Sequence, residues 1–71
     1  MTFAEYTRLR RTEAGVSLQA VADALELPHR SMVHRRETGE TEWKFSEVIK
    51  LTALLQTKLS EFVAGWENTA I

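Results

Sequence analysis

Apolar residues recur at intervals of three or four positions along most of the chain, which is the period of an α-helix. In the first segment, Phe3, Tyr6 and Leu9 follow this spacing, and Thr2 with Glu5 forms a capping box at its start. No segment of the sequence alternates between apolar and polar positions with the period of two that a half-buried strand shows. The pattern therefore predicts an all-α domain.

Breaks in the pattern divide the chain into five predicted helices, over about residues 3–14, 18–25, 28–38, 44–56 and 59–64. Ser17 can cap the second helix, and Pro28 suits the first turn of the third because proline has no amide hydrogen to donate. Gly15, Gly39 and Gly65 each follow a helical segment. We expect each of them to end its helix in a left-handed conformation.

Three of the predicted helices carry a clear apolar face toward a shared core. The faces comprise Leu18, Val21, Ala22 and Leu25 in the second helix, Phe45, Val48, Ile49, Leu51, Thr52 and Leu55 in the fourth, and Leu59, Phe62 and Val63 in the last. The face of the fourth helix is the broadest. We expect Leu25, Leu51 and Leu55 to pack together where the second and fourth helices meet.

A chain of 71 residues has room for one domain, which we place at residues 1–64, with a C-terminal tail over residues 65–71. The chain contains no cysteine, so disulfides and thiolate metal sites are excluded. Its first residues lack the basic and apolar regions of a secretory signal, and no apolar run is long enough to span a bilayer. We therefore expect a soluble cytoplasmic protein without a membrane partner.

The formal net charge of −1 argues at first against nucleic acid, because phosphate neutralisation dominates non-specific binding. The charges are divided unevenly, however. Residues 1–36 carry six Arg against four carboxylates, a balance of +2, whereas residues 37–71 carry three Lys against six Glu, a balance of −3. The basic half contains the second and third helices, so we expect one face toward phosphates and weak non-specific binding.

Several short motifs carry a resemblance to a known family. They are Ala-Gly-Val-Ser at 14–17, Val21-Ala22, Arg-Glu-Thr-Gly at 36–39, Leu-Thr-Ala-Leu-Leu at 51–55 and Leu-Ser-Glu-Phe at 59–62. Over about residues 3–64 the chain resembles the helix-turn-helix family of phage Cro proteins and repressors. The resemblance implies a five-helix fold, a third helix that enters the major groove of double-stranded DNA, and a homodimer that represses transcription from an operator with two-fold symmetry.

Three positions depart from the family pattern. Leu18 stands where the family often has a Gln that contacts a phosphate or supports the recognition helix, and Gln19 follows it. Glu26 replaces the usual Gly of the turn, which either changes the turn or costs about 1 kcal/mol in a left-handed backbone. Counting from the two ends of the motif places either Met32 or Val33 at the core position of the third helix.

The outer face of the third helix carries the predicted DNA contacts. With Met32 and Val33 pointing inward, the residues that point outward are Arg30, Ser31, His34, Arg35 and Thr38. Arg can donate two hydrogen bonds to guanine in the major groove, and Ser and His can donate or accept there. The predicted DNA-binding set also includes Ser17, Gln19 and His29. The alternative is an ordinary solvated face of charged residues.

Two charged positions near the end of the third helix are predicted to support the fold. Arg36 falls between the two inward residues on the helical wheel, so we expect its stem to pack inward while its guanidinium reaches a carboxylate or a phosphate at the edge. The resemblance implies an ion pair between Arg11 and Glu37, which would join the first helix to the third. Arg10 is an alternative partner, and two independent surface charges are the other possibility.

The resemblance also places a dimer contact at Thr41, Trp43 and Phe45. Trp66, in the predicted tail, is a further candidate because large apolar residues at the edge of a fold are enriched in interfaces. The alternative for both tryptophans is that they cap the small core.

Other kinds of binding and chemistry are not expected. His29 and His34 lie about 140° apart on a helix, so we predict no metal site. No nucleophile has a plausible base and orienting group, so we predict no enzyme, no cofactor and no small-molecule ligand. The alternative to a DNA-binding regulator is a protein-interaction adaptor, antitoxin-like or anti-regulator, whose acidic C-terminal half binds a protein partner.

Overall fold

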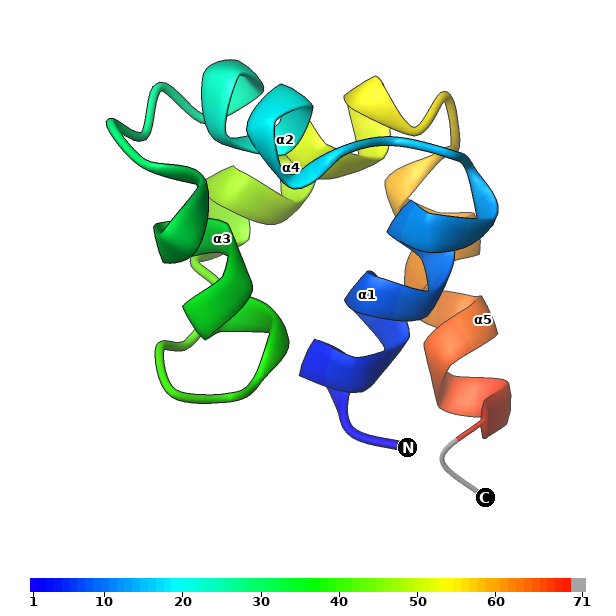
Figure 1. Ribbon diagram of the computed structural model, residues 1–71. Helices are drawn as coiled ribbons and strands as arrows, with labels where there is room; N and C mark the ends of the chain where they lie inside the picture. The colour runs from blue at the N-terminus through cyan, green and yellow to red at the C-terminus, as the bar shows by residue number, and fades with distance from the viewer. Residues whose placement is uncertain (70–71) are drawn as a thin grey trace.

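Five α-helices account for most of the chain, and the computed structural model describes residues 1–69. The helices are α1 (Phe3–Glu13), α2 (Leu18–Ala24), α3 (Arg30–Glu37), α4 (Phe45–Leu54) and α5 (Leu59–Thr69). In Figure 1, α1 and α5 lie side by side on the right, α3 stands on the left, and α2 and α4 lie between them at the top. No strand occurs within residues 1–69, so the predicted all-α class with five helices is confirmed. In this part of the chain, none of the helices is long and apolar enough to cross a bilayer.

Side-chain caps and left-handed residues close several helix ends as predicted. Thr2 and Glu5 form the capping box of α1, with the Glu5 N–H donating to Thr2 Oγ1 at 3.1 Å and the Thr2 N–H to Glu5 Oε1 at 2.8 Å. Ser17 Oγ accepts a backbone N–H of the first turn of α2 at 3.0 Å. Gly15 and Gly39 follow α1 and α3 with φ of +70° and +83°, which confirms their left-handed conformation.

Two helix boundaries differ from the prediction. Pro28 lies outside the third helix, and the extended residue His29 (φ −140°) occupies the N-cap position, so α3 begins at Arg30. The fourth helix ends at Leu54, because Gln56 adopts a φ of +56°. Glutamine is a good helix former, so nothing in the local sequence marks the end of the helix before residue 56, and the predicted helix is too long.

The prediction that Gly65 ends the last helix is wrong, because α5 continues through it to Thr69. Gly65 lies against Tyr6 of α1, where a Cβ atom would collide with the tyrosine hydroxyl. Glycine therefore lets α1 and α5 approach closely. Trp66 belongs to the same helix and packs edge to face on Phe3, with ring centroids 5.3 Å apart. Residues 65–69 of the predicted tail are thus helical, and residues 70 and 71 lie outside the described residues.

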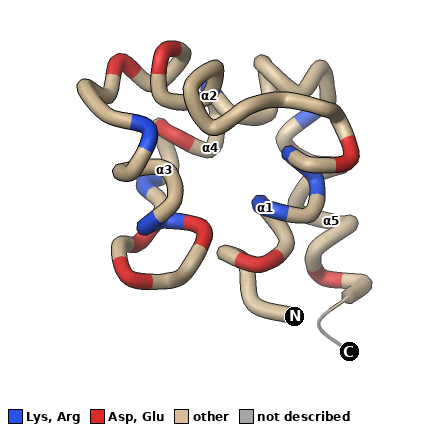
Figure 2. The backbone as a smooth tube through the Cα atoms, viewed as in Figure 1, with Lys and Arg blue, Asp and Glu red and all other residues tan. Residues whose placement is uncertain are grey.

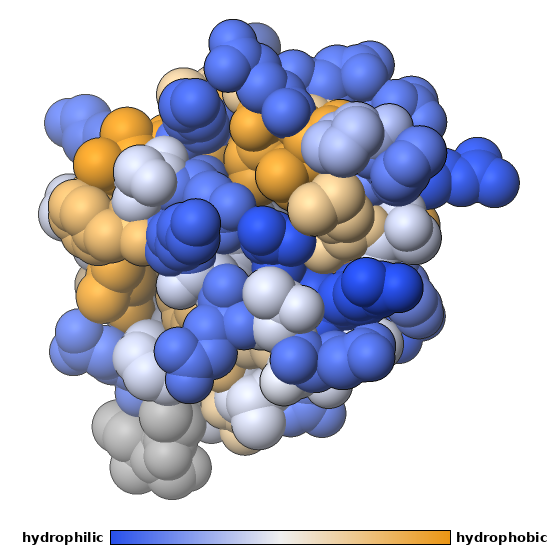
Figure 3. Space-filling model, turned by 90° about the vertical axis from the view of Figure 1, so that its left-hand side faces the viewer, coloured by the Kyte–Doolittle hydropathy of each residue, from blue (hydrophilic) through white to orange (hydrophobic). Residues whose placement is uncertain are grey.

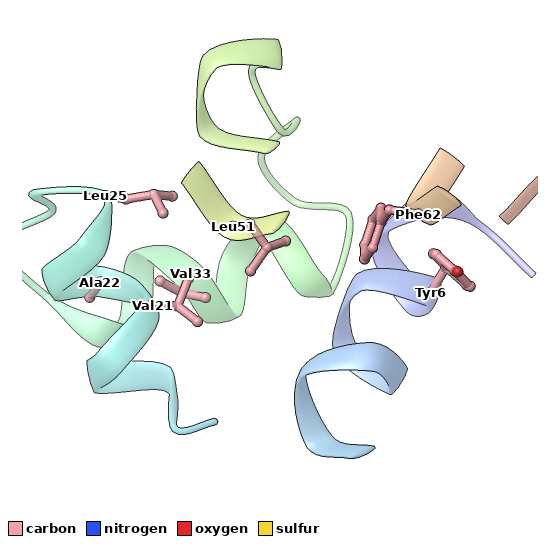
Figure 4. Close-up of a cluster of buried hydrophobic side chains, with 7 residues drawn as sticks. All are labelled: Tyr6, Val21, Ala22, Leu25, Val33, Leu51 and Phe62. Carbon is pink, nitrogen blue, oxygen red and sulfur yellow. The ribbon is translucent and has the colours of Figure 1, made fainter. Parts of the chain in front are cut away.

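A single apolar core, to which all five helices contribute, holds the fold together (Figure 4). Its buried residues are Tyr6, Val21, Ala22, Leu25, Val33, Leu51 and Phe62. Figure 4 shows Leu51 between the side chains of α2 and α3 on one side and the aromatic pair of Tyr6 and Phe62 on the other. The predicted burial of Leu25 and Leu51 is confirmed, whereas Leu55 is only partly buried.

The buried face of α4 is narrower than the predicted one. Val48, Leu51 and Thr52 are buried, but Phe45 and Ile49 keep 69% and 46% of their surface exposed. The reason is that α4 packs against α2 and α5, which leaves one of its sides open to solvent. The expectation that Phe45 and Ile49 face the core is therefore wrong.

Candidate nucleic-acid interface

The outer face of α3 is polar, cationic and open to solvent. Its exposed residues are Arg30, Ser31, His34 and Arg35, and the C-cap residue Thr38 is exposed beside them. Val33, on the opposite side of the helix, is fully buried. Figure 3 looks at this side of the molecule and shows mostly hydrophilic residues, with hydrophobic patches in the upper centre and along the left-hand edge. The predicted outward orientation of these residues is confirmed.

Val33 is the core residue of α3. It has no exposed surface, while Met32 is partly buried. Of the two alternatives that the sequence leaves open, Val33 is therefore correct. In the connection between α2 and α3, Glu26 adopts a φ of +58°, so the chain accepts the left-handed backbone at this residue.

Arg36 is buried and ties α3 to α4. Its Nε and Nη2 donate to the two carboxylate oxygens of Glu47, each at 2.9 Å, and its Nη1 donates to the Met32 carbonyl at 2.7 Å. Glu47 Oε1 also accepts the Lys44 N–H at 3.0 Å. Burial raises the pKa of Glu47, but the hydrogen bonds from Arg36 and Lys44 and the guanidinium charge outweigh it, so the pKa is lowered. The predicted inward stem and carboxylate partner of Arg36 are confirmed.

Glu37, the next residue, ties α3 to α1. Arg11 Nε and Nη2 donate to its two carboxylate oxygens at 2.6 and 3.1 Å, and Arg11 Nη1 donates to the Val16 carbonyl at 2.9 Å. Arg10 points elsewhere, donating to Tyr6 Oη at 2.9 Å, so the predicted pair of Arg11 and Glu37 is confirmed over its alternatives. Two paired and buried charges thus fix the last turn of α3 from both sides.

Fewer arginines near α3 are outside ion pairs than the number of arginines in the sequence suggests. Of the six Arg in residues 1–36, three form ion pairs within the fold: Arg10, Arg11 and Arg36. Arg8, Arg30 and Arg35 are exposed and take part in none of the ion pairs among residues 1–69. Figure 2 shows basic residues along α3 and acidic residues both in the connection before it and in the loop after it. The cationic surface is therefore short and has acidic ends.

The other predicted DNA contacts lie at helix ends. Ser17 and Gln19 are exposed at the start of α2, where Ser17 serves as the cap and Gln19 Nε2 donates to Asp23 Oδ1 at 2.9 Å. His29 is exposed at the N-cap of α3 and makes no side-chain capping bond. Thr38 donates its hydroxyl to the Arg35 carbonyl at 3.1 Å, which leaves its oxygen able to accept.

The four residues predicted for a dimer contact have different environments. Thr41 and Phe45 are exposed. Trp43 and Trp66 are partly buried and pack against the chain's own core, as the alternative interpretation predicts. The Trp66 indole N–H donates to the Met1 carbonyl at 3.3 Å, whereas the Trp43 indole nitrogen is buried without a partner among the described residues.

Sequence reasoning missed Glu47 as the partner of Arg36 and Ile49 as an exposed residue. Glu47 carries a usable signal, because an acidic residue in the first turn of a helix commonly binds the backbone N–H at the helix start. Ile49 carries none, since an amphipathic pattern does not show which side of α4 its neighbours cover.

No family model, curated protein or solved structure matches this chain. An inference about function therefore rests on the residues of the molecule itself. Those residues provide an exposed cationic helix face with buried residues and two ion pairs behind it.

Proposed function

We propose that this chain is a sequence-specific transcriptional regulator of the Cro and repressor type, which binds double-stranded DNA by inserting α3 into the major groove. One observation carries the proposal: α3 and its C-cap residue Thr38 expose five polar or cationic residues on one face, while buried residues and two ion pairs hold the opposite face of the helix. A helix that reads bases needs both properties, since it must present hydrogen-bonding groups at a fixed angle.

The order of residues along α3 suits this role. Recognition helices contact base edges mainly with residues near their N-terminus. Arg30 and Ser31 are the first two residues of α3, and His34 follows one turn later on the same side. These three side chains would reach the bases, while Arg35, farther along, would contact bases or phosphates.

The small number of arginines outside ion pairs bears on how many copies of the chain bind one operator. Phosphate contacts supply most of the non-specific affinity of such proteins. With acidic residues at both ends of the cationic surface, one protomer would bind DNA weakly, so we propose a homodimer on an operator with two-fold symmetry. Repression would follow from occupying a promoter in the cytoplasm, and occupancy would depend on the protein's concentration.

Selection from a pool of random DNA duplexes tests the function. The wild-type chain should enrich a motif with two related half-sites, and its affinity should fall as salt rises. The double variant R30A/R35A should lose the enrichment, while the control K50A/K58A, which removes two exposed cations from α4 and the loop before α5, should keep it.

The net charge of −1 favours one other function, a protein-interaction adaptor. The same experiment separates the two. If no duplex is enriched at low salt, and a protein partner is captured equally well at low and high salt, the chain is an adaptor and the DNA proposal fails.

A further inference from the structure

We infer that a cavity between the start of α1, the end of α3 and the loop before α4 binds a small, neutral aromatic molecule that carries a carbonyl and an N–H group, as a free nucleobase does. The cavity, here called the α1–α3 pocket, has a volume of about 250 Å³. In Figure 1, the start of α1 faces the loop that follows α3. The residues that line the pocket include Phe3, Ala4, Arg36, Thr41, Glu42 and Trp43.

The walls and the size of the α1–α3 pocket suit a planar ring. Three separate segments of the chain build the pocket, so no local motif marks it, and the sequence predicts no small-molecule ligand. Phe3 and Trp43 are both partly buried in its walls, and aromatic side chains pack well on other aromatic rings. Pockets for drug-sized molecules have volumes of about 300–1,000 Å³. A slightly smaller pocket therefore fits a molecule of one or two rings without a sugar or a phosphate.

Arg36 supplies hydrogen-bond donors that the fold does not use. Its guanidinium has five N–H groups, and three of them bind the Glu47 carboxylate and the Met32 carbonyl. Within the described part of the chain, this leaves one N–H on each Nη atom. The side chain lines the pocket although Arg36 keeps only 6% of its surface exposed. A carbonyl of the ligand can therefore accept from a donor that is shielded from water.

The charges around the pocket favour a neutral ligand. Glu47 already neutralises Arg36. Glu42 is exposed at the pocket and takes part in none of the ion pairs among residues 1–69. Its carboxylate repels a carboxylate or phosphate ligand but accepts a hydrogen bond from an N–H group, and the Thr41 hydroxyl beside it can donate or accept. A ring with both a carbonyl and an N–H meets Arg36 and Glu42 together.

Trp43 adds an unsatisfied hydrogen-bond donor. Its indole nitrogen is buried and has no partner among the described residues. A buried N–H without an acceptor costs free energy. Because no hydrogen bond to a described residue fixes the indole, the ring can turn toward a ligand in the pocket and donate to its carbonyl or to a ring nitrogen. Ligand binding would thus satisfy a donor that the fold leaves unpaired.

A second cavity lacks these features. It has a volume of about 330 Å³, and it lies along α1. Its lining residues are Glu5, Arg8, Leu9, Thr12 and Glu37. None of them is aromatic, and Glu37 already accepts two hydrogen bonds from Arg11. The α1–α3 pocket is therefore the better site for a planar ring.

Calorimetric titration of the whole chain with hypoxanthine tests the inference. Hypoxanthine should bind with a dissociation constant below about 1 mM. Benzoate, an aromatic anion, and inosine monophosphate, which adds a sugar and a phosphate to the same base, should each bind at least about tenfold more weakly.

Variants of the pocket locate the binding site. Glu42→Ala should raise the dissociation constant for hypoxanthine by about tenfold, while the control Glu40→Ala, at an exposed residue of the same loop, should leave it unchanged. Ala4→Leu fills the pocket and should abolish binding, whereas Ala53→Leu, at an exposed residue of α4, should not. Circular dichroism melts should confirm that each variant folds. If Ala4→Leu does not fold, the comparison of the two glutamate variants decides.

The indole N–H signals in NMR spectra give a second readout, because the chain has two tryptophans. Hypoxanthine should shift the Trp43 signal, identified by its persistence in Trp66→Phe, by more than the Trp66 signal. Absence of both heat and a Trp43 shift at millimolar hypoxanthine overturns the inference. So does equal weakening by Glu40→Ala and Glu42→Ala, or binding of benzoate or inosine monophosphate as tight as that of hypoxanthine. All of these measurements are made without DNA, so their outcome is separate from that of the DNA selection.

Discussion

The guanidinium of Arg36 is buried, and it is tolerated there only because the carboxylate of Glu47 accepts two hydrogen bonds from it. Burial penalises both charges, and the pair repays that cost only when its remaining hydrogen bonds are also satisfied. Here the Met32 carbonyl and the Lys44 N–H provide them. The helical period predicts the inward direction of Arg36. Its partner lies 11 residues away on another helix, so the pairing depends on how α3 and α4 cross, which local sequence does not encode.

The stability of the fold should fall in acid through Glu47. Burial raises its pKa, but the hydrogen bonds from Arg36 and Lys44 lower it below the ordinary value of 4.5. The contribution of the pair is therefore complete above that value and is lost as the pH falls through the folded-state pKa. In denaturant unfolding, Glu47→Gln should be less stable than wild type by about 1–3 kcal/mol near neutrality, and the two proteins should converge in acid. A constant difference at every pH would contradict this role.

Arg30 should read a base rather than only attract phosphate. Lysine keeps the positive charge but cannot form the forked pair of hydrogen bonds that arginine offers to guanine. Arg30→Lys should therefore relax the preference at one position of each half-site, at a cost of about 1–3 kcal/mol on the preferred operator. Its salt dependence should stay close to that of the wild type. Titrations against operators changed at single positions measure both quantities, and an unchanged base preference would move the reading role to another residue of α3.

At the scale of whole helices, Gly65 lets α1 and α5 pack closely and does not end α5. In a helix interior, alanine is normally more favourable than glycine by about 1 kcal/mol. Here a Cβ atom at position 65 would collide with the buried Tyr6 hydroxyl, so Gly65→Ala should destabilise the fold. In a Tyr6→Phe background, which lacks the hydroxyl but keeps the ring carbon 3.3 Å from the added Cβ, the same substitution should cost much less. Thermal melts of the four proteins in this double-mutant cycle give the coupling directly, and additive effects would show that α1 and α5 are not in close contact here.

Two helices end in left-handed residues that are not glycine. After both Glu26 and Gln56, the N–H of the next residue donates to a carbonyl five residues back, at 2.8 and 3.0 Å. Because glycine relieves the left-handed strain, Glu26→Gly and Gln56→Gly should each stabilise the fold by up to about 1 kcal/mol. The control is Glu40→Gly, at an exposed residue without positive φ, which should lower the melting temperature. Lower stability in all three variants would exclude this account of the helix ends.

The helix ends also show how far the sequence can be read. The caps at Thr2 and Ser17 and the turns at Gly15 and Gly39 depend on neighbouring residues, so local rules find them. The role of Gly65 depends on a tyrosine from a distant helix, and the local rule for glycine gives the wrong result there. The exposed side of α4 is missed for the same reason, because exposure depends on how the helices are packed.

At the scale of the whole molecule, the charge count and the structure give different sizes for the cationic surface that we propose to bind DNA. The sequence assigns a balance of +2 to residues 1–36. The structure commits Arg10, Arg11 and Arg36 to ion pairs within the fold, which leaves few cations for phosphates. A count of charges cannot separate arginines that support the fold from those that face solvent, and this limits how well the site could be predicted. The outer face of α3 itself was predictable, because it follows from one helix and one buried residue.

The acidic loop after α3 should weaken the binding of random DNA more than the binding of the operator, and should thereby raise selectivity. Glu40 and Glu42 are exposed beside the cationic surface and repel phosphates of any sequence. Exposed charges interact over about 10 Å at 0.1 M salt, so the molecule, 34 Å in its longest dimension, is large enough for distant charges to be screened. E40Q/E42Q should therefore raise the affinity for random duplex more than the affinity for the selected operator, and so reduce the ratio of operator affinity to random-duplex affinity.

The matched control E61Q/E67Q removes the same charge from α5, on the other side of the molecule from α3 in Figure 1, and should leave that ratio unchanged. Fluorescence anisotropy with both duplexes measures it, and equal effects of the two double variants would show that only the net charge matters.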